Sequence, residues 1–179
     1  MNYREANINN VGGIVKVKVD TWKTTYKGII SNEYLQNLSY DENELKWKKR
    51  FMDQNNKSII YVAETENQKI VGFALANLEK FNPIVYLPQA EKFIGELGAI
   101  YVLKEFQDKR IGTKLVQLVV EYLLKHGIIS MIVWVLRDNL YRSFYEKLGG
   151  IYIGEQFIEI GRTKYVEVAY GWYNIGTIL

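Results

Sequence analysis

The chain has 179 residues, which is enough for one domain with a substantial buried core and short for two. Its hydrophobic content of 48% excludes a disordered chain, and its net charge of +3 is too small to indicate nucleic-acid binding. It contains no Cys and one His, which argues against disulfides, thiolate nucleophiles and multi-histidine metal sites. We therefore expect a single domain over residues 1–179 that works without a metal.

The N-terminal residues MNYREANINN lack the apolar stretch of a secretory signal. No apolar run reaches the roughly 18 residues that a membrane-spanning helix needs. We expect a cytoplasmic protein that binds neither membranes nor nucleic acids. Whether it forms a homodimer is left open by the sequence.

The N-terminal part begins with residues 3–6, which read as a short strand. From Ile8 to Tyr26 the apolar residues recur at steps of three and four, as on one face of a helix. The stretch Val15–Val19 also alternates like a strand, and Gly12-Gly13 disfavours a helix. The longer period favours the helix. A further helix is expected to start at Ser31.

A third helix is predicted from Asp41 to Phe51, with Leu45, Lys48 and Phe51 on one side. The β-rich runs Ser58–Thr65 and Ile70–Leu78 then read as a hairpin turning at residues 66–69. Residues 81–90 contain both prolines and read as a loop. Three apolar residues of this loop are candidates to overhang a site, and these are Phe81, Tyr86 and Leu87.

The most informative segment runs from Gly95 to Leu123. It consists of a strand ending in Ala99–Val102, a polar turn over Gln107–Thr113, and an amphipathic helix. A strand that enters a helix through such a turn directs free backbone N–H groups and the positive end of the helix dipole at one spot. The turn therefore predicts a phosphate or pyrophosphate site, although an ordinary basic loop has the same composition.

The C-terminal part continues with Ser130–Leu136, an apolar run typical of a strand buried on both faces. Asp138 or Asn139 is expected to cap the next helix, which Gly149 ends. A closing hairpin follows, formed by Ile151–Glu159 and Tyr165–Trp172 around a turn at Gly161-Arg162. The order of elements predicts a mixed α/β domain with helices on both faces of one sheet.

The turn from Gln107 to Gly112 resembles the acetyl-CoA signature of the GNAT superfamily of N-acetyltransferases, which reads Gln/Arg-x-x-Gly-x-Gly/Ala. Arg110 stands in place of the first glycine. Residues 138–149 resemble a second block of the family, and residues 19–28 resemble the stretch beside its acceptor cleft. The resemblance implies the GNAT-like acyl-CoA N-acyltransferase fold, with a single mixed, largely antiparallel sheet.

By this resemblance the protein moves an acetyl group from acetyl-CoA to a primary amine of a small molecule or peptide. Tyr145 is implied as the acid and Glu96 as the base, and Trp22 and Tyr26 as substrate-binding residues. Asn139 is implied to contact the pantetheine arm. The other implied cofactor-binding residues are Ile100, Tyr101, Val102, Gln107, Asp108, Lys109, Arg110, Ile111, Gly112 and Thr113.

Each of these assignments has a plainer alternative. Glu96 also fits a solvated charge at a strand end, Tyr145, Trp22 and Tyr26 fit the core, and Gly98 fits either a β-bulge or simple packing. A non-catalytic module that binds CoA or acyl-CoA is the alternative function.

Other function classes fit the sequence less well. Ile111-Gly112-Thr113-Lys114 has the wrong order for a phosphate-binding P-loop, and no Gly-x-Gly-x-x-Gly follows a strand. The basic run Lys46, Lys48, Lys49 and Arg50 around Trp47 would suit an RNA- or protein-binding face. Such a run is usually the solvated face of a helix.

Overall fold

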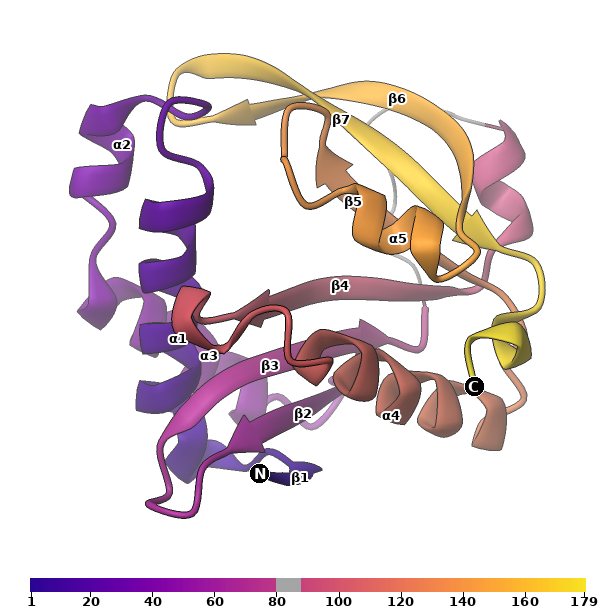
Figure 1. Ribbon diagram of the computed structural model, residues 1–179, viewed down its shortest axis with the longest axis horizontal. Helices are drawn as coiled ribbons and strands as arrows, with labels where there is room; N and C mark the ends of the chain where they lie inside the picture. The colour runs from indigo at the N-terminus through magenta and orange to yellow at the C-terminus, as the bar shows by residue number, and fades with distance from the viewer. Residues whose placement is uncertain (80–87) are drawn as a thin grey trace.

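The protein folds around one mixed sheet (Figure 1). The computed structural model describes residues 1–79 and 88–179, and within them seven strands pair in the order β1-β2-β3-β4-β5-β7-β6. Only β4 and β5 are parallel among the described pairs, so the predicted mixed, largely antiparallel sheet is confirmed. The strands are β1 Asn2–Glu5, β2 Ser58–Glu64, β3 Ile70–Asn77, β4 Gly95–Val102, β5 Met131–Leu136, β6 Ile151–Ile160 and β7 Thr163–Trp172.

Helices cover both faces of the β1–β4 part of the sheet. In Figure 1, α4 lies on one face, and α1 and α3 lie on the other. Strand β3 is buried along nearly its whole length because it packs on both sides. The helices are α1 Val11–Thr25, α2 Asn32–Gln36, α3 Tyr40–Met52, α4 Ile111–Lys125 and α5 Ser143–Lys147, with short 3-10 turns at η1 Ile8–Asn10, η2 Pro88–Lys92, η3 Lys104–Phe106 and η4 Ile175–Ile178.

The segment that alternates like a strand, Val15–Val19, is part of helix α1, as the longer period predicts. Tertiary packing explains why two adjacent glycines do not break this helix. A Cβ atom on Gly13 would lie 2.8 Å from Cδ1 of Ile70, so glycine lets α1 approach β3 closely. The cost in helix propensity is offset by the apolar area that the close approach buries.

The helix predicted over Asp41–Phe51 is α3, and burial on it does not follow the apolar residues alone. Leu45 is 61% exposed, whereas Asn43 and Trp47 are buried. The ring of Trp47 packs edge-on against Phe73 of β3, with 5.3 Å between the ring centroids. This helix is polar around most of its circumference, so its apolar period is weak and the single large indole decides which side faces the sheet. Burial also removes Trp47 from any surface that would stack on RNA bases.

The region after β5 also differs from the expectation. The helix predicted to begin at Asp138 or Asn139 begins at Ser143 and has no side-chain cap. Oδ1 of Asn139 instead accepts the backbone N–H of Tyr141 at 2.9 Å, which makes a local turn. Of the predicted loop over residues 81–90, positions 88–90 belong to η2, and Phe81, Tyr86 and Leu87 lie outside the described residues.

The sheet opens in its middle, between β4 and β5 (Figure 1). In the described chain these strands pair at Gly95–Met131 and Glu96–Ile132 and then separate. On the other edge of β4, Leu75 of β3 pairs with Ala99 and Ala76 pairs with Leu97, so Gly98 is the extra residue of a β-bulge. The edge of β4 beyond Glu96 therefore faces an opening instead of a neighbouring strand.

Candidate active site

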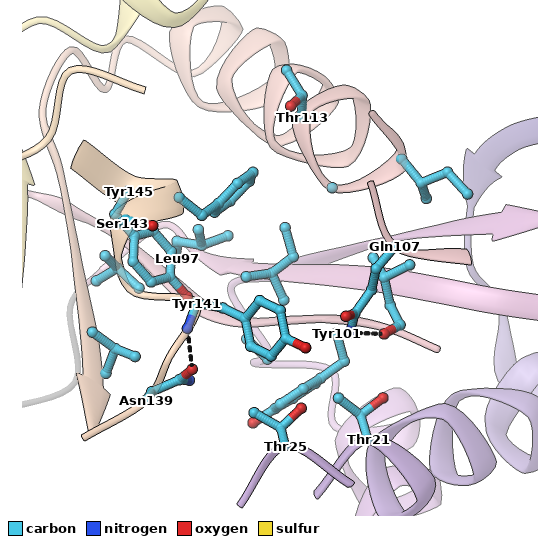
Figure 2. Close-up of a pocket in the computed structure, with 18 of the residues that line it drawn as sticks. Thr21, Thr25, Leu97, Tyr101, Gln107, Thr113, Asn139, Tyr141, Ser143 and Tyr145 are labelled. Atoms are coloured by element: carbon cyan, nitrogen blue, oxygen red, sulfur yellow. Dashed lines mark hydrogen bonds between the residues drawn. The ribbon is translucent and has the colours of Figure 1, made fainter. Parts of the chain in front are cut away.

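A cavity of about 400 Å³ occupies the opening between β4 and β5 (Figure 2). Thr21 and Thr25 of α1, with Tyr26 directly after the helix, line it from one face of the sheet. The N-terminal turn of α4 and the side chains of α5 line it from the other face. The cavity thus passes through the sheet, and a molecule bound in it would meet the free edge of β4 along its length.

The turn that enters α4 presents unpaired donors to this cavity. The N–H of Lys114 donates to the carbonyl oxygen of Arg110 at 3.0 Å, which is the first bond of the helix. The N–H groups of residues 111–113 precede that bond and have no partner within the helix. The turn is tied to β4 because Nε2 of Gln107 donates to the carbonyl oxygen of Val102 at 2.9 Å. The result is a helix end at the cavity wall whose free N–H groups suit an anion.

Arg110 adopts the left-handed backbone conformation, with φ of 59°, at the N-cap of α4. This conformation is the reason why the family signature has glycine there, since a residue with a Cβ atom is strained in it by about 1–2 kcal/mol. Asp108 has a similar φ of 58°. Alternating left-handed residues turn successive N–H groups toward one side, which is the geometry of an anion-binding nest.

Tyr145 of α5 lies at the cavity with 8% of its surface exposed. Burial raises the pKa of its hydroxyl, and the nearby hydroxyl of Tyr101 raises it further. A phenol with a raised pKa keeps its proton at neutral pH. Tyr145 is therefore protonated at neutral pH, and its hydroxyl can donate a hydrogen bond at the cavity.

A hydrogen-bonded network of polar side chains forms the α1 side of the cavity. Nε1 of Trp22 donates to the hydroxyl oxygen of Tyr101 at 3.0 Å, and Nδ2 of Asn139 donates to the hydroxyl oxygen of Tyr26 at 3.4 Å. Burial raises the pKa of Tyr26, with smaller contributions from Tyr101 and Tyr145. These bonds fix the positions of the hydroxyl groups around the opening.

Most of the residues proposed from the sequence line this cavity. They are Tyr26, Ile100, Tyr101, Val102, Gln107, Asp108, Arg110, Ile111, Gly112, Thr113, Asn139 and Tyr145. Lys109 and Trp22 are not among its lining residues. Nζ of Lys109 donates to the carbonyl oxygen of Glu105 at 2.9 Å, and the indole of Trp22 packs edge-on against Tyr26.

Glu96 lines a second cavity, on the α3 side of the sheet. Its Oε2 accepts a hydrogen bond from Nδ2 of Asn77 at 3.3 Å. The two cavities share Gly98 and Ala99, the residues at the bulge of β4. Glu96 is thus placed next to the first cavity, across the bulge from it.

Several residues near the site were not identified from the sequence. Thr21 and Thr25 line the first cavity, and their spacing of four on a predicted helix was a usable signal. Glu167 of β7 is half-buried, and burial raises the pKa of its carboxyl. The hydrogen bond that Nε2 of Gln156 donates to it at 2.7 Å lowers this pKa in part, and the charge of Glu96 raises it further. Its position depends on β7 pairing with β5, which the sequence does not reveal.

Two further features of the described residues bear on function. No group of three or more His, Cys, Asp or Glu side chains among them is arranged to hold a metal ion. None of their helices is both long and apolar enough to cross a membrane.

The family model of the acetyltransferase (GNAT) family matches residues 21–150, so the chain belongs to this family. The predicted family and fold are confirmed. The chain is 37% identical over 175 residues to an uncharacterized N-acetyltransferase, YuaI, of Bacillus subtilis strain 168, covering 98% of this chain and 94% of that protein.

More distant relatives extend the similarity. A spermidine N(1)-acetyltransferase of Thermoplasma acidophilum is 27% identical over 150 residues, with 82% of this chain and 85% of that protein covered. A crystal structure of the PaiA N-acetyltransferase of Thermoplasma acidophilum in complex with coenzyme A has a TM-score of 0.68 at 21% identity, covering 96% of this chain and 98% of that one. That likeness shows that the two proteins share a fold.

Proposed function

We propose that the protein transfers an acetyl group from acetyl-CoA to a primary amine by direct attack. The observation that carries this proposal is the cavity through the sheet, where the free edge of β4, the N-terminal turn of α4 and the hydroxyl of Tyr145 meet. Family membership supports the reaction class, and the geometry of the cavity supports the roles that we propose for individual residues.

The residues present fit a CoA thioester. The N–H groups at the start of α4 suit a pyrophosphate, and the left-handed Arg110 helps to turn them toward the cavity. The unpaired edge of β4 suits the amide groups of pantetheine, which bind to such an edge as an added strand does. Asn139 lies across the cavity from this edge, near Tyr26.

The chemistry requires two proton transfers. The acceptor nitrogen must be neutral to attack the thioester carbonyl carbon, and the carbon–sulfur bond then breaks to release a thiolate. We assign removal of the amine proton to Glu96 acting through water, because this carboxylate lies at the bulge that separates the two cavities. The buried hydroxyl of Tyr145, which stays protonated at neutral pH, is assigned to protonate the thiolate.

A screen of acetyl-CoA with primary amines, read as release of free thiol and as acetylated product by mass spectrometry, tests the proposal. Amine-dependent thiol release with a matching acetylated amine is expected. Binding of CoA without turnover of any amine would favour the non-catalytic CoA-binding module instead. The relative that acts on spermidine makes polyamines an obvious first group to include.

A further inference from the structure

The second cavity has the shape and charge of a separate binding site. Its volume is about 340 Å³, and it lies between α3 and strands β3 and β4. It shares Gly98 and Ala99 with the first cavity, the one between β4 and β5, which we call the cofactor-side cavity. A molecule bound in it would therefore lie next to the first cavity, on the Glu96 side of β4. Its remaining lining residues are Lys46, Trp47, Arg50, Leu75, Asn77 and Glu96.

The charges in this cavity are segregated. Glu96 and its partner Asn77 lie on the β3–β4 side, and Lys46 and Arg50 lie on α3. The buried ring of Trp47 stands on the same helix, between the two cations in sequence. An extended ligand with a positive and a negative end would match this arrangement better than one with two positive ends.

A third cation, Lys18 of α1, lies near Lys46 and Arg50 without lining the cavity itself. Burial lowers the pKa of Lys18 on α1, and the charges of Lys46 and Arg50 lower it further. Lys18 donates to Oδ1 of Asn43 at 2.9 Å and Arg50 donates to Oγ of Ser58 at 3.3 Å, and the ion pairs within the described chain include none of these three cations. By contrast, Lys48 on the same helix pairs with Glu44 at 3.2 Å.

A cluster of like charges at a cavity is unfavourable until an anion binds there. We propose that the second cavity is the acceptor site, and that Lys46 and Arg50 bind a carboxylate of the acceptor while its amine lies at Glu96. The acceptor class is then a small amine that carries a carboxylate, such as an amino acid. This inference rests on the proposed function, and it disfavours polyamines, whose second ammonium would meet Lys46 and Arg50.

Matched acceptors test the inference directly. ω-Aminovalerate, n-pentylamine and cadaverine have similar lengths and differ in the end group, which is a carboxylate, a methyl and an ammonium. We expect kcat/KM to fall in that order, with about a tenfold step or more between the carboxylate and the methyl. Shorter and longer ω-amino acids, each with its matching diamine, extend the comparison if this length does not fit the cavity.

Variants assign the effect to the two cations. Lys46→Gln and Arg50→Gln are expected to raise KM for the amino acid about tenfold and to raise KM for n-pentylamine, which has no carboxylate, much less. Lys46→Glu is expected to reverse the order, so that cadaverine becomes the better acceptor. Lys48→Gln is the matched control, because Lys48 is exposed and does not line the cavity.

The outcomes separate this inference from the proposed function. If n-pentylamine or cadaverine is acetylated at least as well as every amino acid, the inference is wrong and the proposed function stands. If Lys46→Glu leaves the order of acceptors unchanged, the inference is wrong as well. If no amine of any kind is acetylated, the proposed function itself fails.

Discussion

The aromatic ring of Phe144 lies against the backbone of Gly112. A Cβ atom on Gly112 would stand 3.4 Å from Cζ of Phe144 and 3.7 Å from Cδ1 of Ile100. The contact joins the first turn of α4 to α5 at the wall of the cofactor-side cavity. Gly112, Phe144 and Ile100 all line this cavity. A methyl group fits at ordinary contact distance, whereas a longer side chain at this position must enter the cavity.

Gly112→Asp is therefore expected to weaken CoA binding by about tenfold or more, because it places an anion beside the N–H groups that would hold a pyrophosphate. Gly112→Ala is the matched control and should bind CoA nearly as the native protein does. Arg110→Ala should cost less than Gly112→Asp, since Arg110 is exposed and its charge is screened. Calorimetric titration with CoA measures all three. A larger loss for Arg110→Ala would show that the guanidinium carries phosphate recognition.

Arg110→Gly is expected to stabilise the fold by about 0.5–1 kcal/mol, because glycine adopts the left-handed conformation with φ of 59° without strain. The midpoint of urea unfolding should rise while the m-value stays the same. Lys109→Gly in the same turn is the control, since Lys109 has no positive φ and glycine there only adds flexibility to the unfolded chain. A destabilised Arg110→Gly variant would contradict the strain argument.

The order of elements and the hairpins could be predicted from the sequence because each follows from local period and turn residues. The ambiguity over Val15–Val19 shows the limit, since the close packing of Gly13 on Ile70 favours the helix and is a tertiary contact. The sequence did not predict which side of α3 is buried, because its apolar period is weak and the burial of Trp47 orients the helix.

The cofactor-side cavity could be predicted largely from one motif, since the turn from Gln107 to Thr113 is continuous in sequence. The second cavity could not be predicted, because it combines residues from α3, β3 and β4, and these come together only through the register of the strands. Glu96 was proposed from the sequence as the base, but the cavity that it lines was not predicted. The bulge at Gly98 was one of two alternatives that the sequence left open, and strand pairing decides for it. Glu167 was missed because its position depends on the pairing of β7 with β5.

Glu167→Gln is expected to stabilise the protein at neutral pH. Burial raises the pKa of Glu167 in the folded state above its ordinary value near 4.5, so the ionised carboxylate is unfavourable in the fold. The stability that this group contributes when protonated is lost as the pH rises through its folded pKa. The variant keeps an oxygen that accepts from Nε2 of Gln156 and avoids this loss.

The melting temperature of Glu167→Gln should exceed that of the native protein at pH 7, and the difference should shrink to nothing as the pH falls below the ordinary range of a Glu side chain. Glu159→Gln on the same hairpin is the control, because Glu159 is exposed and should show little change at either pH. If the difference in melting temperature grew toward acidic pH, the pKa of Glu167 in the folded protein would not be raised.

Glu96→Gln is expected to lower kcat by about 10²-fold or more with little change in CoA affinity, because a carboxamide cannot remove a proton from the amine. Gln retains an oxygen that accepts from Nδ2 of Asn77, so the local structure should persist. Steady-state kinetics together with CoA titration separate the two effects. An unchanged kcat would mean that the amine loses its proton to solvent, and Glu96 would then serve only to bind the acceptor.

Tyr145→Phe is expected to lower kcat by about 10²-fold while leaving CoA affinity nearly intact. The change removes one hydroxyl and keeps the ring, which packs on Phe144 with 5.5 Å and on Tyr170 with 6.0 Å between centroids. Because burial raises the pKa of this hydroxyl, the native enzyme should keep the proton donor throughout the neutral range, so deprotonation of Tyr145 should not limit turnover there.

The leaving group provides the sharper measurement for Tyr145. If the hydroxyl protonates the departing thiolate, the loss in Tyr145→Phe should be smaller for an acetyl thioester of a more acidic thiol, because such a thiolate leaves without help. Tyr141→Phe is the matched control, since Tyr141 lines the same cavity but is 46% exposed. Equal losses for both thioesters would show that Tyr145 positions the substrate instead of donating the proton, and unchanged turnover would assign the residue to the core.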